Sequence, residues 1–355
     1  MTIAVPDTEA KIAGRSALLN SPRTVLCLGG LAAACLLPFV LSNYQVFQLT
    51  LVLVMAIAIL GVNLVTGYNG QISLGHGAFY AIGAYVTAIL MSKAGVAYWA
   101  TLPVSAVVCL TVGFLFGFPA LRLGGHNLAL ATFALAVAAP QILKSSTFEF
   151  WTGGVQGIPL AKPTAPFGMP LTEDSWLYFF TLSIAVVMFL AAYNLVRGRT
   201  GRAIVAIREN QLAAEAMGIN TSFYKALIFG ISAMYTGLAG SLGAIAVQYV
   251  APDSFTVFLS ISLLIGGVVG GIASISGALY GAAFLQFVPD VTDSLSKAAP
   301  WAIYGLILIL FMRFMPEGIA GFVARLSPRR NARVAYVVAR VPMLRALRRW
   351  LGRES

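Results

Sequence analysis

Long apolar stretches separated by short polar segments recur along nearly the whole chain. A helix needs roughly 20 residues to cross about 30 Å of hydrocarbon, and ten stretches approach or reach that length. None shows the strict period-two alternation of barrel strands, so helices must satisfy the backbone polar groups in lipid. The pattern predicts an all-α polytopic transmembrane bundle of about 10 spans. The expected spans are 24–41, 46–66, 72–91, 98–121, 127–143, 176–196, 226–248, 257–273, 276–288 and 301–315.

Two regions of this pattern are irregular. The 276–288 stretch has only about thirteen apolar residues, too few for a full crossing, and it follows GGVVGG at 266–271. The second and third spans are joined by GYNGQIS at 67–73, which is consistent with either a short hairpin loop or a discontinuous helix. The segments 70–85 and 271–286 also resemble each other, either through duplication or because Gly, Ala and Ser are common in membrane helices.

Composition and charge exclude a soluble protein. The chain of 355 residues is 59% hydrophobic and 10% charged, whereas roughly a quarter of an ordinary soluble domain is charged. The net charge of +11 lies at the two ends and in one central segment, and nine arginines fall between 325 and 353. Basic residues of membrane proteins collect on the cytoplasmic side. The charge therefore indicates membrane topology, and nucleic acid is not an expected partner.

The charge distribution and the even span count together predict the topology. With a cytoplasmic N-terminus, ten spans place all three basic clusters in the cytoplasm, whereas nine or eleven would leave one outside. We expect a cytoplasmic N-terminal segment at 1–23, a permease domain at 24–321 with a cytoplasmic loop at 197–225, and an Arg-rich cytoplasmic tail at 322–355. The tail either contacts anionic lipid or is disordered. The first apolar run could be a removable signal peptide, but its length favours a membrane helix.

The central polar segment, GRTGRAIVAIRENQLAAEAMGINTSFYKA at 198–226, has amphipathic character. Ile204, Ile207, Leu212 and Met217 recur at roughly helical spacing, and Gly218 stands where a helix would stop. An amphipathic helix on the cytoplasmic side must bury its apolar stripe. It can do so against lipid, against the protein itself, or against a partner.

Several ordered blocks of the sequence resemble one family. LVTGYNGQISLGHGAFYAIGAY at 64–85, GRAIVAIRENQLAAEAMGIN at 201–220, VAPDSF at 250–255, GGIASISGALYGA at 270–282 and MPEGIAG at 315–321 are similar to LivM-type branched-chain amino-acid permeases of ABC importers. The run containing Ala213, Ala214, Glu215 and Gly218 is similar to a scrambled EAA…G coupling loop. The resemblance covers about residues 50–321, and the Arg-rich tail lies outside it.

The resemblance implies an ABC importer permease architecture in the bacterial inner membrane. The implied partners are a homologous LivH-type permease, two cytosolic ATPases, a periplasmic solute-binding protein and membrane lipid. The chain contains no Gly-Lys-Ser or Gly-Lys-Thr, so it lacks the Walker motif, and ATP would be used by the partner subunits. The implied coupling residues, of which Ile207 and Leu212 are expected to enter an ATPase cleft, are Arg202, Ile207, Arg208, Glu209, Leu212, Ala213, Ala214, Glu215 and Gly218.

Intramembrane polar residues are the candidates for the translocation pathway, because polar groups within a bilayer usually serve a function. The densest such group is Asn63, Asn69, Gln71, Ser73 and His76. We expect no catalytic residue, metal site or cofactor bound by this chain. An ion-coupled carrier would need buried carboxylates, and a membrane enzyme would need a catalytic constellation; the sequence favours neither. The resemblance implies import of branched-chain or other small hydrophobic amino acids, or similar small organic solutes.

Overall fold

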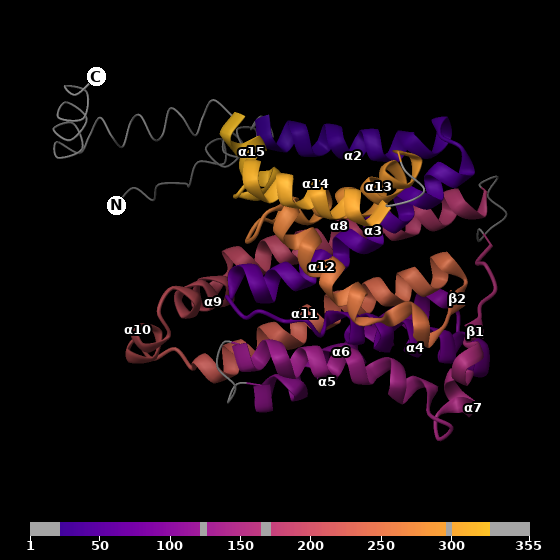
Figure 1. Ribbon diagram of the computed structural model, residues 1–355, viewed down its shortest axis with the longest axis horizontal. Helices are drawn as coiled ribbons and strands as arrows, with labels where there is room; N and C mark the ends of the chain where they lie inside the picture. Colours follow the sequence, from indigo (N-terminus) through magenta and orange to yellow (C-terminus); the bar gives the residue numbers. More distant parts are fainter. Residues whose placement is uncertain (1–21, 121–125, 165–171, 296–299, 327–355) are drawn as a thin grey trace, which may run out of the picture.

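The computed structural model describes residues 22–120, 126–164, 172–295 and 300–326. The expected N-terminal segment and the Arg-rich tail lie almost wholly outside these residues. Most described residues are helical, and the long helices run side by side (Figure 1). The elements are α2 Pro22–Val40, α3 Asn43–Val62, η1 Asn63–Tyr68, α4 His76–Ala94, α5 Tyr98–Ala120, α6 His126–Lys144, α7 Glu149–Thr152, η2 Gly154–Gln156, β1 Ile158–Pro159, α8 Glu173–Arg197, α9 Arg199–Glu209, α10 Gln211–Ala216, α11 Thr221–Val247, β2 Tyr249–Val250, η4 Pro252–Phe255, α12 Val257–Gly270, α13 Ile275–Leu295, α14 Pro300–Phe314 and α15 Gly318–Leu326.

The all-α fold class is confirmed, and each of the ten expected spans overlaps a helix. In the described part of the chain, seven segments are both long and apolar enough to cross a membrane. α12 has only 14 residues, or about 21 Å at 1.5 Å per residue. α13, however, has 21 residues. The helix continues past the expected 276–288 stretch through Pro289 and Asp290, but it is not among the seven segments long and apolar enough to cross.

The core of the bundle is built around α11. In an apolar stretch of 18 consecutive residues of α11, 89% of the residues are buried within the protein. In the corresponding stretch of the segment Gly305–Arg325, only 6% are buried. Three helices approach α11 at small residues. An added Cβ at Gly83 of α4 would lie 1.9 Å from the Gly237 carbonyl oxygen, and one at Gly61 of α3 would lie 2.8 Å from the Ser232 oxygen. Small residues therefore set the helix spacing, as is common in membrane bundles.

The GxxxG pairs also serve packing within this chain. In α5, Gly113 faces Ala233 and Gly117 faces Ala226, both on α11. The pairs in α12 and α13 face each other: an added Cβ at Gly270 would lie 2.0 Å from the Gly277 oxygen, and one at Gly281 would lie 1.9 Å from the Gly266 oxygen. α12 and α13 thus form a tight helical hairpin.

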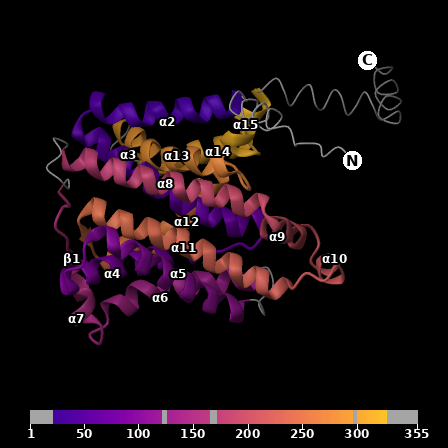
Figure 2. The ribbon, with the colours of Figure 1, turned by 180° about the vertical axis from the view of Figure 1, so that it is seen from behind.

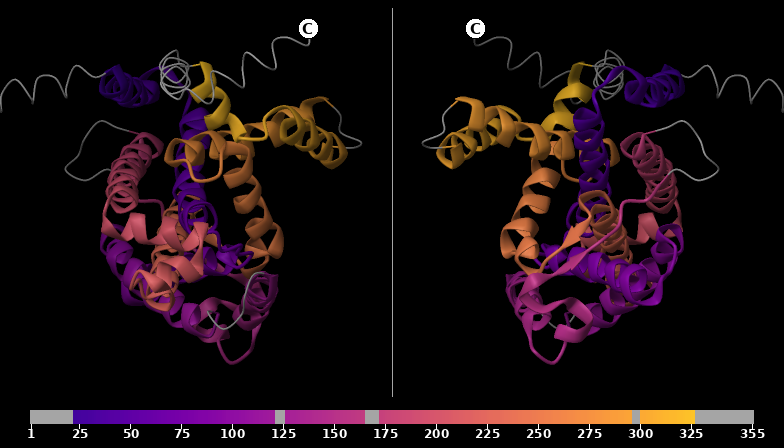
Figure 3. Two further views of the ribbon diagram at one scale, coloured as in Figure 1. Left: turned by 90° about the vertical axis from the view of Figure 1, so that its left-hand side faces the viewer. Right: turned by 90° about the vertical axis from the view of Figure 1, so that its right-hand side faces the viewer.

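The two ends of the bundle differ. α9 and α10 project at one end, where α15 also lies, and α7 with the β1–β2 pair lies at the other (Figures 1 and 2). The short antiparallel β1–β2 pair joins Ile158 to Val250 and Pro159 to Tyr249. Viewed along the long axis, α2 and α14 occupy opposite flanks of the bundle (Figure 3). α2 contacts α8 through a 3.0 Å hydrogen bond from the Tyr178 hydroxyl to the Ala34 carbonyl.

We predict that Gly83→Ala destabilises the protein by about 1–3 kcal/mol, because the added methyl overpacks the α4–α11 contact. Thermal unfolding of the detergent-solubilised protein measures the effect. Gly305→Ala is the matched control, since an added Cβ at Gly305 meets no atom within 4 Å. Equal melting temperatures for the two variants would contradict this account of the packing.

Candidate functional site

The cytoplasmic segment implied by the resemblance folds as two helices, α9 and α10, rather than one. Asn210 separates them with an extended backbone, φ −158° and ψ 108°. Its side-chain oxygen accepts a hydrogen bond from the Ala213 amide at 3.0 Å. An asparagine in this position is a typical helix N-cap. The sequence therefore contained a signal for the break.

α9 buries its apolar face against its own subunit. Ile204 and Ile207 are 0% and 4% exposed. This corrects the expectation that Ile207 enters an ATPase cleft, because its side chain is already covered by the bundle. On the exposed part of α9, Arg202 donates a 3.2 Å hydrogen bond to the Arg197 carbonyl, and Glu209 ends the helix.

α10 and the residue after it carry the most exposed large apolar side chains of this segment. Leu212 is 78% exposed and Met217, directly after the helix, is 83% exposed, whereas Ala214 is buried and Ala213 is exposed. The helix is joined to the start of α11 by Glu215, which accepts hydrogen bonds from Gln211 at 3.0 Å and Thr221 at 2.7 Å.

These hydrogen bonds favour the charged form of the Glu215 carboxylate. Those from Gln211 and then Thr221 hold its pKa below the usual value. Glu215 is therefore ionised at neutral pH. Through Thr221 it holds α10 against the start of α11.

Gly218 ends α10 as the sequence predicts. Its φ is +81°, which an L side chain rarely adopts. Its amide donates to the Glu215 carbonyl, and the Ile219 amide donates to the Ala214 carbonyl. This is the double hydrogen-bond pattern of a Schellman C-cap. It turns the chain sharply from α10 toward the Asn220 cap of α11.

Asn63, a pathway candidate, instead holds the junction between α12 and α13, residues 271–274. Its amide nitrogen donates to the carbonyls of Gly271 at 3.2 Å and Ser274 at 2.8 Å, and its oxygen accepts from the Ala273 amide at 2.8 Å. All three partners are backbone groups left free where the helices are interrupted. Asn63 therefore has a structural role in this conformation.

The 69–75 segment is a non-helical discontinuity inside the bundle. This agrees with the discontinuous-helix alternative for this region and not with a short hairpin loop at the surface. It leads back from the α9 end toward the middle of the molecule, where α4 begins (Figure 1). The buried Ser73 hydroxyl accepts from the Gly75 amide at 3.4 Å. His76 Nε2 lies 2.5 Å from Ser232 Oγ, near the middle of α11. The first residue of α4 is thus buried inside the bundle, next to the middle of α11.

Sequence reasoning missed the residues that satisfy this discontinuity from other helices. Thr132 of α6 accepts from the Leu74 amide at 3.0 Å, and Ser260 of α12 accepts from the Gly77 amide at 2.8 Å. Ser and Thr are common in membrane helices. Their sequence positions alone did not distinguish these two from any others.

Several buried polar atoms near this segment have no hydrogen-bond partner among the described residues. They include both side-chain amide atoms of Asn69, Nε2 of Gln71 and Nδ1 of His76. Each unpaired buried group costs about 1–3 kcal/mol. Such groups have unused hydrogen-bonding capacity, unlike Asn63, whose side chain is already bonded.

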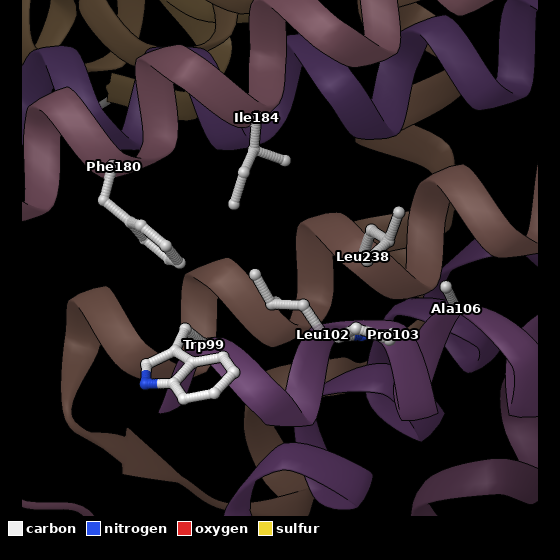
Figure 4. Close-up of a pocket in the computed structure, with 7 residues that line it drawn as sticks. All are labelled: Trp99, Leu102, Pro103, Ala106, Phe180, Ile184 and Leu238. Carbon is white, nitrogen blue, oxygen red and sulfur yellow. The ribbon is translucent and has the colours of Figure 1, made fainter. Parts of the chain in front are cut away.

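A groove of about 350 Å³ lies between α5, α8 and α11 (Figure 4). Its lining is almost entirely apolar and consists of Trp99, Leu102, Pro103, Ala106, Phe180, Ile184 and Leu238. Among these side chains only the Trp99 indole N–H can form a hydrogen bond, and none carries a charge to pair with a charged solute. The groove therefore does not fit a pathway for such a solute.

The described residues include no group of three or more His, Cys, Asp or Glu side chains placed to hold a metal ion. What the arrangement provides is a helical bundle with an interrupted helix pair, and a projecting apolar tip at the end where α9 lies. Such features define a polytopic transport protein better than a catalytic one.

The chain belongs to the family described as "Branched-chain amino acid transport system / permease component", which matches residues 44–315. It is 33% identical over 306 residues to the high-affinity branched-chain amino acid transport system permease protein LivM of Salmonella typhimurium, covering 79% of this chain and 71% of that protein. It is 28% identical to BraD of Pseudomonas aeruginosa and 26% identical to LivH of Escherichia coli, in each case covering 75% of this chain and 91% of the relative.

Family membership confirms the main functional prediction. The chain is a multi-pass membrane permease of the ABC type, and its family lacks an ATPase domain, so ATP is hydrolysed by partner subunits. The self-contained carrier and the membrane enzyme are both excluded. Its relationship to LivM and LivH implies an ABC complex.

We predict that Asn63→Leu lowers the stability of the protein by about 2 kcal/mol or more, because three buried or partly buried backbone groups lose their partner. Chemical unfolding in mixed micelles measures the change. Asn194→Leu is the control, since Asn194 is exposed on α8. An Asn63→Leu protein as stable as the control would show that these hydrogen bonds contribute little.

Proposed function

We propose that this chain is one of two permease subunits of a bacterial inner-membrane importer for branched-chain or other small hydrophobic amino acids. The other would be a LivH-type permease, with two cytosolic ATPases and a periplasmic solute-binding protein completing the complex. The substrate class is supported by relatives that are branched-chain amino acid permeases in two different bacteria. The two-permease arrangement is supported by similarity to both LivM and LivH.

The ATPase contact is assigned to α10 and its C-cap. The observation that carries it is the exposure of Leu212 and Met217 on a short helix whose two ends are fixed by Asn210 and Gly218. An exposed apolar tip on a braced helix suits insertion into a partner's cleft, where central apolar anchors dominate binding. A helix lying on lipid would instead spread its apolar residues along one side.

The solute pathway is assigned to the 69–76 region. Asn69, Gln71 and His76 offer buried donors and acceptors without partners among the described residues. Amide and imidazole groups can bond the ammonium and carboxylate of an amino acid. Non-helical backbone at membrane depth is typical of transporter binding sites. Asn63 and Ser73 are assigned a structural role, because their side chains form hydrogen bonds within the protein.

The end of the bundle that carries α9 and α10 is assigned to the cytoplasm. The first described residues of α2 and the last of α15 lie at this same end (Figures 1 and 2). Arg199, Arg202 and Arg208 of α9 and Arg325 of α15 also belong to it. Concentration of basic residues at one end follows the positive-inside rule and supports cytoplasmic termini.

We predict that Leu212→Asp combined with Met217→Asp weakens ATPase association about thirtyfold or more. Loss of a central apolar anchor costs on the order of 2 kcal/mol. Co-purification of the ATPases with the tagged permease pair measures the effect. Val155→Asp is the control, since Val155 is 66% exposed in η2 at the opposite end.

Ile207→Asp is not a suitable test of the contact, because it would place a charge inside the subunit. Undiminished co-purification with the double variant, together with normal solute-stimulated ATP hydrolysis, would reject the role assigned to α10.

We also predict opposite labelling at the two ends of the bundle. In a variant without native cysteines, an impermeant maleimide added outside spheroplasts should label Val155→Cys and spare Met217→Cys. Both positions are strongly exposed, so accessibility within the fold does not distinguish them. External labelling of Met217→Cys would overturn the assigned topology, and detergent permeabilisation shows that this cysteine can react.

A further inference from the structure

Three segments that are distant in the sequence meet near the α9 end of the bundle. They are the C-terminal end of α9, the π-helical segment η1 that continues α3, and the α12–α13 junction at 271–274. An added Cβ at Gly67 of η1 would lie 2.6 Å from the Ala273 amide nitrogen and 2.0 Å from Asn63 Oδ1. η1 and the junction are therefore in direct contact, without space for even a methyl group between them.

The junction has an unusual backbone that depends on this contact. Gly271 has φ +125°, and Ala273 has φ +58°, a left-handed conformation rare for a residue with a side chain. Such residues are strained and persist only where the surroundings hold them. The surroundings here are Asn63, whose three hydrogen bonds to the junction are described above.

Arg208 connects α9 to the other side of η1. Its Nη1 donates a 2.5 Å hydrogen bond to the Gly67 carbonyl. Its aliphatic stem lies across Gly70, where an added Cβ would be 3.1 Å from Cγ. The last carbonyls of a helix lack partners within it and carry partial negative charge, so a guanidinium both caps and stabilises this end. Charge-assisted hydrogen bonds of this kind are among the stronger ones in proteins.

These contacts form one continuous connection from Arg208 to Gly67, and from η1 with its Asn63 side chain to the junction. π-helical turns are rare and are frequently found at functional sites. Movement of α9 would therefore act on the two discontinuities together, since residues 69–75 begin directly after η1 and the junction touches it.

We propose that Arg208 is a positioning residue that transmits movement of α9 through η1 to the α12–α13 junction. The inference rests on the proposed coupling function of the α9–α10 region, but it assigns Arg208 a task distinct from ATPase docking. α10 binds the ATPase, and Arg208 passes the displacement inward. Loss of Arg208 should thus separate ATP hydrolysis from transport while leaving the complex assembled.

The test uses the full importer in proteoliposomes, with the binding protein and radiolabelled leucine. Arg208→Ala should reduce leucine imported per ATP hydrolysed about tenfold or more, because a charge-assisted hydrogen bond is lost. ATPase co-purification should be unchanged. Arg208→Lys, which keeps a cationic donor, should restore most of the coupling. Arg199→Ala is the control, since Arg199 lies exposed at the start of the same helix.

A second measurement follows the junction itself. Ile272, within it, is 50% exposed. In a cysteine-free background, the labelling rate of Ile272→Cys in solubilised complex should change at least threefold between the nucleotide-free and ATP-trapped states. Adding Arg208→Ala or Gly67→Ala should abolish that change, the second because its methyl separates η1 from the junction. Thermal melting of each variant identifies any that are simply unfolded.

Normal leucine-to-ATP coupling in Arg208→Ala overturns the proposal, and so does a nucleotide-dependent labelling change that persists in this variant. Failure of the underlying function is distinguishable, because then the Leu212 and Met217 double variant would keep its ATPases. An Arg208→Ala complex that loses its ATPases would also reject the proposal, since it would place Arg208 in docking rather than transmission.

Discussion

Inside a membrane, a backbone amide or carbonyl that leaves a helix has no water to bond, so another group of the protein must bond it. This requirement governs the bundle, because the described part of the chain leaves helical geometry at 69–75 inside it and again at 271–274 near its α9 end. Thr132 and Ser260 satisfy the first discontinuity, and Asn63 satisfies most of the second. The cost of unpaired backbone in lipid makes each of these polar side chains part of the fold.

The same requirement explains the tight helix packing. A side chain can reach a freed backbone group only if the helices lie close together, and the bundle achieves this with small residues. Gly83 against Gly237, and Gly270 against Gly277, leave no room for a Cβ. Close approach and polar satisfaction therefore depend on each other: separating the helices would also separate donors from acceptors. This is consistent with the burial of α11, which faces three neighbours through glycine and other small residues.

The helices and their approximate ends could be predicted from apolar runs, and Gly218 from its place after an amphipathic stretch. α13 was underestimated because apolar counting stops at Pro289, whereas the helix continues. Ile207 was placed on the wrong side because the five-residue step to Leu212 crosses a break at Asn210, and the two residues belong to different helices. The structural role of Asn63 could not be predicted from the sequence, because its hydrogen-bond partners lie more than 200 residues away along the chain.

The exposed tip formed by Leu212 and Met217 has a consequence for the subunit before it assembles. Apolar side chains held in water on a braced helix cannot fold away, because Asn210, Glu215 and Gly218 fix both ends of α10. With α10 on the cytoplasmic side as proposed, a copy without ATPases presents an exposed apolar surface to the cytosol. The geometry that favours docking also makes the lone subunit prone to aggregation and recognisable to chaperones and proteases. With the ATPase contact proposed for α10, the cell must match the synthesis of permease and ATPase chains to keep this six-residue helix covered.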